Sequence, residues 1–557
     1  MNEASVGTKP TDRSRPTLTR IPFSVIPGQS QLFLDHLSGS PSLAKYFPNY
    51  SPDVASLARS SSDVLAQYST DRSAICDALV DINRIAGAGE KAFTNIDRLR
   101  GSDAVAVLTG QQAGLFTGPL YTVYKAMTAI KFAEHLTELG VNAVPIFWAA
   151  TEDHDLEEVS WASVIGEGDV IARARYDGKP VIDGAPVANV VIDGSISKAV
   201  DELIGSLRDG ERLRESIEKT WREGTRFGKA FLKQIAEMFE PFGLILADPM
   251  NSKLRELSTP IIVEAIENAS AINSRLQERD TELGADGYHS QVLVENDYFP
   301  AFIFTDLGQR SALKLGAVGS FASKVDKRHF SADELRKIAE ETPQRLSPGV
   351  MLRPVVQDHL FPTICYIGGG AEIAYFGQNS VVYETLGRRV TPIFHRQSFT
   401  IVEPRIRRAL EAYGLDMGDL FVGRDELVPR LVEKIESPET AELLANVKTA
   451  IDGELSKLDA AFSDIDVTLA AGFAKRRKKI EYHLQAAETK AFAAIMRKSG
   501  DADRRLDAIF ANLLPNGGLQ EREINVLSYL ARYGESFLRT VYHATDVDER
   551  DHILIDI

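Results

Sequence analysis

Four consecutive titratable residues, Glu152-Asp153-His154-Asp155, make the densest group of acid and base side chains next to a predicted strand. A histidine flanked by carboxylates has its charged form favoured and its tautomer fixed, which suits general acid–base chemistry or metal binding. Two carboxylates and a histidine could hold Mg²⁺ together with a nucleotide, although no spacing here demands a metal. The alternative is a solvated acidic loop that caps the following helix. We favour the chemical role, because composition and position agree.

A loop with three glycines, Gly110, Gly114 and Gly118, is the second candidate site, and it also carries Gln111 and Gln112. Neither GxGxxG nor the Gly-Lys-Ser/Thr of a P-loop occurs in it, so neither nucleotide-binding fingerprint applies. The loop offers backbone N–H groups that no side chain shields, two amides that donate and accept, and a helix N-terminus directly behind. A tight turn that needs glycines for packing is the alternative. The adjacent glutamines favour a binding role.

The residues around both groups predict the elements that position them. An apolar run at 104–108 predicts a strand, apolar residues at spacings of three and four predict a buried helix over 120–139, and the run 143–150 predicts a second strand. Strand, helix and strand within about fifty residues form a βαβ unit, which predicts a parallel sheet. Since ligands bind at the carboxyl ends of such strands, we expect the two loops to open on the same side.

A second strand, glycine loop and helix pattern lies at 362–372. It could form another wall of the crevice, or it could be a flexible loop; its candidate residues are Gly368, Gly369 and Glu372. Upstream, Arg353 and Asp358 flank a proline-containing segment that we expect to be extended. An arginine suits a carboxylate or a phosphate, and surface ion pairing is the alternative.

The composition of the 557 residues excludes several classes of protein. With 79 acidic against 63 basic residues and a net charge of −16, the chain lacks the basic character that a nucleic-acid partner needs. Its two cysteines make no disulfide framework and no zinc-ligand spacing, which favours a reducing, cytoplasmic compartment and no zinc. The longest apolar run, 141–150, is far shorter than the roughly 20 residues of a membrane span. We expect a soluble protein without a membrane partner.

Changes of pattern along the chain predict its divisions. Apolar residues from Val447 to Ile495 recur in steps of three and four with one shift of register, which predicts a long helix in a coiled coil. The predicted fold class is α/β, divided into a disordered arm at 1–20, a parallel-sheet core at 21–164, 231–285 and 346–402, β-rich insertions at 165–230 and 286–345, a helical coiled-coil domain at 403–512, and a C-terminal turn and helix packing back on the core at 513–557.

Four longer motifs resemble a single family: TGQQAGLFTGPLYTVYKAMTAIK (109–131), PIFWAATEDHDLEEV (145–159), LRPVVQDHLFPTICYIGGGAEIAYFGQ (352–378) and LLPNGGLQER (513–522). It is the cysteine ligase family of bacillithiol biosynthesis, BshC, named for adding L-cysteine to glucosaminyl-malate. The resemblance implies a Rossmann-like core related to class I aminoacyl-tRNA synthetases, two inserted connective subdomains, and a coiled-coil domain that makes a homodimer. It also implies an adenine nucleotide, to which the last motif could contribute Asn516, Gly517, Gly518, Gln520 and Arg522.

The chain departs from that wider superfamily at one place. Where those enzymes carry HxGH, this chain has Gly118-Pro119-Leu120-Tyr121, and it has no clear KMSKS loop. The usual aminoacyl-adenylate mechanism is therefore not implied. Activation of the cysteine carboxylate by ATP could proceed through an acyl phosphate or through an adenylate.

Together, the resemblance and the predicted crevice give a hypothesis for each residue. We expect an ATP-coupled ligase in which His154, with Asp153 or Asp155, takes the proton from the attacking amine. The remaining predicted residues are Glu152 in the catalytic group, Gln111 and Gln112 to orient a substrate, Arg353 or Lys125 to hold a carboxylate, and Tyr121 and Asp358 in the binding site. The alternatives are a non-catalytic dimeric scaffold that binds a nucleotide or metabolite, and a nucleotidyltransferase with another acceptor.

Overall fold

A parallel sheet forms the centre of the molecule. The computed structural model describes residues 16–317, 319–433 and 437–557. Its five-stranded parallel sheet has the order β13-β12-β2-β3-β6, with the strands β2 (Val105–Gln112), β3 (Ala143–Ala150), β6 (Ile245–Ala247), β12 (Thr363–Gly368) and β13 (Ile393–His395). The chain builds outward from β2 in both directions, so the strand order reverses between β2 and β12. Such a switch point opens a crevice at the carboxyl ends of the strands.

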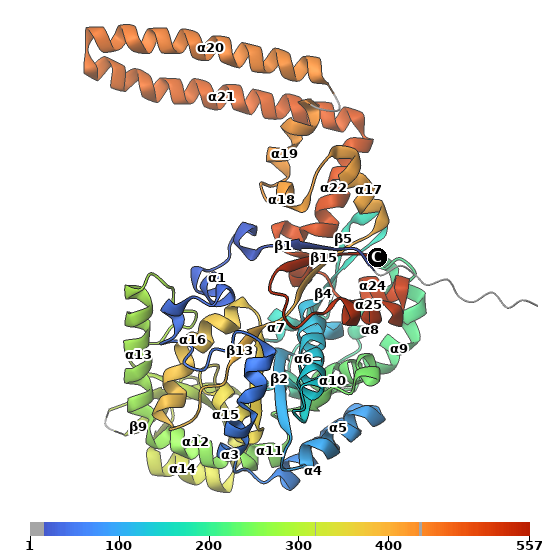
Figure 1. Cartoon of the computed structure of the whole chain (residues 1–557), viewed down its shortest axis with the longest axis vertical. Coiled ribbons are helices and arrows are strands. Elements are labelled where there is room, and N and C mark those ends of the chain that lie inside the picture. Colours follow the sequence, from blue (N-terminus) through green and yellow to red (C-terminus); the bar gives the residue numbers. More distant parts are fainter. Residues whose placement is uncertain (1–15, 318, 434–436) are drawn as a thin grey trace, which may run out of the picture.

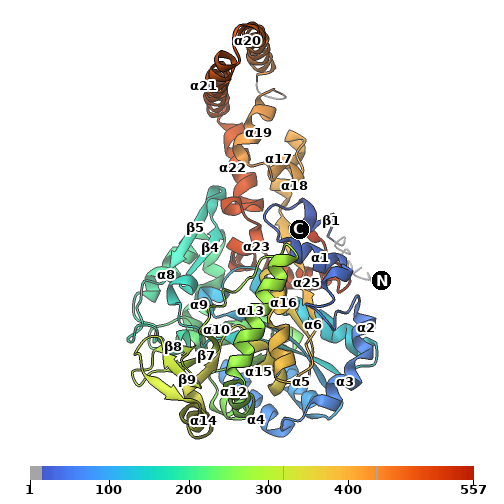
Figure 2. The same ribbon diagram turned by 90° about the vertical axis from the view of Figure 1, so that its left-hand side faces the viewer.

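Helices cover this sheet, and β3 is buried along its whole length. Helix α6 (Tyr121–Glu138) packs on β2 and β3 and is itself largely buried. The predicted βαβ unit is thereby confirmed. Figures 1 and 2 show the sheet surrounded by helices, among them α1 (Gln31–Ser38), α3 (Ser61–Gln67), α4 (Arg72–Ala86), α5 (Glu90–Arg100), α10 (Phe227–Met238), α15 (Arg353–Leu360) and α16 (Gly370–Thr385).

The segment around Pro354, predicted to be extended, differs from the structure. The segment after Leu352 is the helix α15 and not an extended stretch, because Pro354 occupies its first turn, where a missing N–H costs nothing. Earlier in the chain, three helices follow one another: α11 (Ser252–Leu257), α12 (Thr259–Glu267) and α13 (Ala269–Ala285).

The two insertions have different secondary structure. In the first, strands are confined to the hairpin β4 (Trp161–Ile165) and β5 (Ile171–Arg175), and α8 (Ile196–Ser206) and α9 (Arg214–Thr220) follow, so most of the predicted β-rich stretch 165–230 is not β. Apolar side chains of α8 at spacings of three and four fix one face of that helix in the core. The second insertion holds an antiparallel sheet of order β10-β9-β8-β7-β11, with β7 (Tyr298–Phe304), β8 (Arg310–Leu315), β9 (Ser320–Ser323), β10 (His329–Ser331) and β11 (Leu346–Pro348), plus α14 (Ala332–Glu341).

A helical hairpin projects from the body, as both views show. It consists of α20 (Pro438–Ile465) and α21 (Val467–Ser499), and it stands on α17 (Pro404–Tyr413), α18 (Met417–Leu420), α19 (Arg424–Leu431) and α22 (Asp501–Leu513). The coiled coil is confirmed, but its helix is not continuous. Asp466 is extended, and its carboxylate accepts hydrogen bonds from the N–H groups of Thr468 and Leu469, so it starts a second helix.

A small sheet of order β1-β15-β14 ties the two ends of the chain to the middle. It consists of β1 (Leu18–Ile21), β14 (Ser398–Val402) and β15 (His552–Asp556). Most of the predicted arm at 1–20 lies outside the described residues, and its part from Leu18 onward is a strand and not disordered. The C-terminal region also contains α23 (Gln520–Glu523), α24 (Leu527–Tyr533) and α25 (Glu535–Ala544). Among the described residues, no helix has the length and apolar character needed to cross a bilayer.

Candidate functional site

A cavity of about 380 Å³ lies at the carboxyl ends of β2, β3, β12 and β13. Nine of the predicted substrate-binding and catalytic residues line it: Gly110, Gln111, Gln112, Tyr121, Lys125, Asp153, Arg353, Gly369 and Glu372. Arg522, which was predicted for nucleotide binding, also lines it, whereas the sequence patterns did not indicate the polar lining residues Trp148, Tyr366 and Arg396. The glycine loop and the acidic loop thus meet at one edge of the sheet, as the parallel-sheet rule predicts.

Lys125 and Glu372 connect two walls of this cavity. The Lys125 Nζ lies 2.5 Å from Glu372 Oε2, and it donates to the carbonyl oxygen of Gly110 at 3.0 Å and to Gln111 Oε1 at 2.8 Å. Glu372 also accepts from the N–H of Gly369 at 2.8 Å and from the hydroxyl of Tyr366 at 3.0 Å. Burial lowers the pKa of Lys125, and the carboxylate beside it only partly offsets this effect. Lys125 is therefore committed to holding β2 and α16 together.

Asp153 supplies the cavity with a carboxylate whose cationic partner, Arg310, does not itself line the cavity. It accepts from Gln112 Nε2 at 2.8 Å, from the N–H of His154 at 2.9 Å, and from Arg310 Nη1 at 3.4 Å. Burial by itself would raise the pKa of Asp153, but these donors outweigh it and hold the pKa well below its usual range. Arg310 belongs to β8 of the second insertion, and its guanidinium lies 3.7 Å from the ring centroid of Phe302. The carboxylate therefore stays ionised at neutral pH.

The other three residues of the acidic loop do not line the cavity. His154 has a side chain 40% exposed, and its Nδ1 lies 3.5 Å from Asp153 Oδ1. Glu152 is buried in an ion pair with Arg255 at 2.8 Å. Asp155 accepts from the N–H of Glu158 and so caps the short helix α7 (Leu156–Val159). The predicted catalytic group is thus divided, and the capping alternative applies to Asp155.

Arg353 is a cation of the cavity with a single hydrogen-bonding partner among the described residues. Its Nη2 donates to the hydroxyl of Tyr375 at 3.3 Å, and no carboxylate of the described residues lies within ion-pair distance. Burial would lower the pKa of Arg353, but Tyr375, Tyr366 and Glu372 outweigh it and raise the pKa, so the guanidinium keeps its charge. It can accept an anionic group from a ligand.

Four predicted binding residues do not line the first cavity. Asp358 is at the other end of α15, because about 100° of rotation and 1.5 Å of rise per helical residue separate it from Arg353. It accepts from Tyr383 and Thr391, and burial raises its pKa to about 6. The remaining three are glycines: Gly368 closes β12, where a Cβ would lie 2.9 Å from Ile393 and Glu372, and Gly114 and Gly118 belong to a turn whose Gly118 carbonyl accepts from Asn525 Nδ2.

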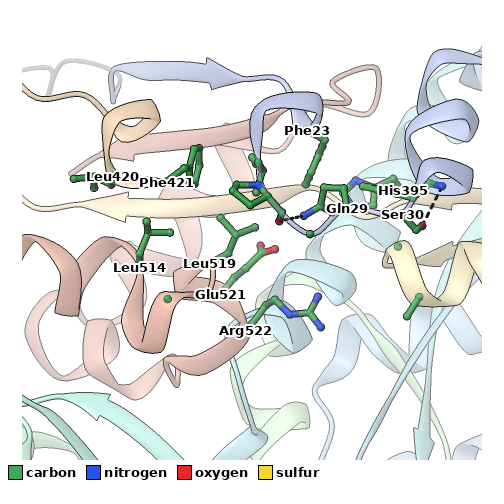
Figure 3. A pocket seen from close by; sticks show the side chains of 18 of the residues that line it. Phe23, Gln29, Ser30, His395, Leu420, Phe421, Leu514, Leu519, Glu521 and Arg522 are labelled. Carbon is green, nitrogen blue, oxygen red and sulfur yellow. Dashed lines mark hydrogen bonds between the residues drawn. The ribbon is translucent and has the colours of Figure 1, made fainter. Parts of the chain in front are cut away.

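A second cavity of about 430 Å³ adjoins the first. Figure 3 shows it between the N-terminal loop with Phe23 and Gln29 and the turn with Leu514, Leu519 and Arg522. Three residues predicted for nucleotide binding line it, namely Gly517, Gly518 and Arg522. Asn516 and Gln520 do not: Asn516 is exposed, and the buried Gln520 exchanges hydrogen bonds with the backbone of Ile401. The two cavities share Gly370, Ala371 and Arg522.

Comparison with known proteins gives matches over nearly all of the described chain. The family model "Bacillithiol biosynthesis BshC, N-terminal Rossmann-like domain" matches residues 18–397, and "Bacillithiol biosynthesis BshC, C-terminal coiled-coil domain" matches residues 399–557. Similar proteins include those of Koribacter versatilis (33% identical, covering 94% of this chain and 97% of the relative), Salinibacter ruber (32%, 98% and 100%) and Solibacter usitatus (34%, 82% and 85%). Each of the three carries the name "Putative cysteine ligase BshC".

Proposed function

The chain belongs to the BshC family of bacillithiol biosynthesis, and from that premise we propose that it is a ligase joining the carboxylate of L-cysteine to the amine of glucosaminyl-malate. The observation that supports this most is the composition of the first cavity. It places in one space an ionised carboxylate, Asp153, and a guanidinium, Arg353, that has no carboxylate partner among the described residues. The acceptor, glucosaminyl-malate, has both an amine and carboxylates, so its binding site needs one negatively charged and one positively charged side chain.

In this proposal Asp153 receives the ammonium form of the amine, and Arg353 receives a carboxylate of the malate. Lys125 was the other candidate for the carboxylate, but its three hydrogen-bonding positions are taken by Glu372, Gly110 and Gln111. The amides of Gln111 and Gln112 orient the substrate from the end of β2. Arg353 is preferred because a planar guanidinium can grip a carboxylate with two parallel hydrogen bonds.

The amine must lose a proton before it can attack. Asp153 is a weak proton acceptor, because its pKa is held well below the usual range. We assign the proton to His154, which adjoins Asp153 and is open to solvent on its other side. Glu152 and Asp155 have no part in this step, since the first is paired with Arg255 and the second caps α7.

Amide formation in water is unfavourable, so we propose that ATP drives the reaction. The second cavity suits an adenine nucleotide, because aromatic side chains such as Phe23 and Phe421 could contact a base and Arg522 could contact phosphates. ATP would supply a phosphoryl or adenylyl group to the cysteine carboxylate, and both routes stay open. Within the described residues, no cluster of three or more His, Cys, Asp or Glu side chains could hold a metal ion, so any Mg²⁺ would be bound chiefly by the phosphates.

We also propose that the protein is a homodimer in a reducing, cytoplasmic compartment. The hairpin of α20 and α21 leaves apolar side chains partly exposed along its length, among them Val447, Leu458, Leu469 and Ile480. A second copy of the hairpin could cover them. Both cysteines, Cys76 and Cys365, are free thiols buried in the core, which agrees with such a compartment.

The direct test is to incubate the purified protein with L-cysteine, glucosaminyl-malate and ATP and to detect bacillithiol by mass spectrometry. We expect product with the wild type and little with Asp153→Asn. A folded wild-type protein that binds these compounds but gives no product would instead support the scaffold alternative. Release of pyrophosphate without cysteine would indicate the nucleotidyltransferase.

A further inference from the structure

Arg396 is a buried cation that lines the first cavity and that no sequence pattern indicated. It follows β13 directly, so it occupies the carboxyl end of that strand, as Asp153 follows β3. The residue is 5% exposed, and its guanidinium carbon lies 5.7 Å from the ring centroid of Tyr121. Burying a guanidinium costs free energy unless its N–H groups have hydrogen-bond partners.

Only one edge of the Arg396 guanidinium is occupied. Nη1 donates to Glu521 Oε2 at 2.9 Å and to the carbonyl oxygen of Gln397 at 3.0 Å, and Nη2 donates to Glu521 Oε1 at 2.7 Å. Glu521 therefore takes the end formed by the two terminal nitrogens. The five N–H groups of a guanidinium form more than one such edge. The Nε–H and the second N–H of Nη2 have no partner among the described residues.

The unoccupied edge lies beside the cavity wall. A Cβ placed on Gly369 would be 3.7 Å from Arg396 Nε, and Gly369 also lines the first cavity. The two parallel N–H groups of this edge match the two oxygens of a carboxylate, just as the occupied edge binds the two oxygens of Glu521. The absence of a side chain at Gly369 leaves room for a ligand at this edge.

Glu521 fixes the orientation of this guanidinium. It is 1% exposed, and besides Arg396 it accepts from Ser398 Oγ at 2.7 Å and from the N–H of Phe399 at 3.1 Å. Both carboxylate oxygens therefore have two donors each. Ser398 and Phe399 belong to β14, so Glu521 is anchored on the small sheet and holds Arg396 toward the cavity.

We propose that Arg396 binds a carboxylate of the malate with its free edge, and that Glu521 is the positioning residue that aims it. This inference rests on the proposed function, and it deepens that function by giving the second carboxylate of the dicarboxylate a partner distinct from Arg353. It also gives a residue of the C-terminal region, Glu521, a role in a site at the carboxyl ends of the parallel strands. Specificity for a dicarboxylate would then require both arginines.

The test is a comparison of steady-state constants. We expect Glu521→Gln to raise the KM for glucosaminyl-malate at least tenfold, while the KM for cysteine and the kcat at saturation change less than threefold. Arg396→Gln should have the same effect, and the double variant should be no worse than either single variant, because both remove one interaction. Glu523→Gln is the matched control: Glu523 lies on the same short helix and pairs with Arg173 and Ser163, outside both cavities, so its variant should keep every constant.

Three outcomes would overturn the inference. The first is an unchanged KM for glucosaminyl-malate in Glu521→Gln, and the second is a rise in the KM for cysteine alone. If Glu521→Gln does not fold, the double variant Arg396→Gln/Glu521→Gln replaces it, because that variant buries no unpaired charge. A wild-type KM for glucosaminyl-malate in the double variant is the third outcome. Calorimetric binding of glucosaminyl-malate to the same variants needs no turnover. It therefore tests Arg396 and Glu521 even if the wild type forms no bacillithiol, an outcome that would refute the proposed function alone.

Discussion

The ammonium of Lys125 lies 2.5 Å from a carboxylate oxygen of Glu372, and this pair joins α6 to the N-terminus of α16 at the point where the strand order reverses. The crevice at such a switch point lies beyond the carboxyl ends of the strands, where no strand spans it, so it could widen easily. The ion pair and the hydrogen bonds of Lys125 to Gly110 and Gln111 fix its width. Stability and site geometry therefore depend on the same contact.

Lys125→Met should destabilise the protein by about 3 kcal/mol, because Glu372 is left as a mostly buried charge without its partner. The double variant Lys125→Met/Glu372→Gln should recover part of this loss, since no unpaired charge remains. Urea unfolding measures both values. A single variant as stable as the wild type would show that the pair contributes nothing.

Arg353→Gln should raise the KM for glucosaminyl-malate about tenfold or more, with little change in kcat, because the lost contact forms equally in the ground state and the transition state. Arg353→Lys should be intermediate, since it keeps the charge and loses the two-pronged geometry. Arg389→Gln is a suitable control, because Arg389 lines a separate small cavity beside Asp358. A lower kcat with an unchanged KM would contradict this role.

His154→Ala should lower kcat about 100-fold at pH 7, the typical contribution of a general base. The loss should shrink as the pH rises toward about 9, because the amine of the acceptor then deprotonates without help. Asp155→Asn is the matched control on the same loop, since asparagine also caps a helix, and it should leave kcat unchanged. A loss that does not depend on pH would exclude His154 as the proton acceptor.

Stability should fall as the pH rises from about 4 to about 6, because of Asp358. Burial raises the pKa of Asp358 from 3.8 to about 6, so in this interval the folded protein keeps a proton that the unfolded chain has lost. At about 1.4 kcal/mol per pKa unit, the free energy of unfolding should fall by about 3 kcal/mol relative to Asp358→Asn. Urea unfolding of both proteins across this range tests the sign; parallel curves would contradict it.

Leu458→Asp should convert the proposed dimer to monomers, because Leu458 is 44% exposed on the projecting hairpin and a second hairpin would have to desolvate the new carboxylate. Lys457→Asp, one residue away and more exposed, should leave the dimer intact. Sedimentation equilibrium distinguishes the two states. A monomeric wild type would refute the proposed dimer outright.

Local patterns predicted the part of the site that follows long buried strands. Gln111 and Gln112 end β2 and Asp153 lies in the loop that follows β3, and the rule for parallel sheets then places them together. Arg396 could not be found in this way, because its strand has only three residues and its partner Glu521 comes more than a hundred residues later. Its orientation is a property of the tertiary structure.

Other errors came from ambiguous local signals. Pro354 was interpreted as a sign of extended chain, yet proline is equally compatible with the first turn of a helix. The heptad spacing continues across Asp466 with only a shift of register, so the turn of the hairpin resembled an irregularity in one helix. β15 was missed because its partners β1 and β14 are far away in sequence, and no local pattern records such pairing.

The position of β15 between β1 and β14 has a consequence for the order of events during synthesis. Residues 18–21 emerge from the ribosome early, but their only strand partner among the described residues is 552–555. The parallel sheet can form while translation continues, whereas the small sheet that anchors Glu521 must wait for β15. A nascent chain would therefore hold an incomplete second cavity until residues 552–556 have been made, and mutations that slow the docking of β15 should reduce the yield of active protein more than they reduce its final stability.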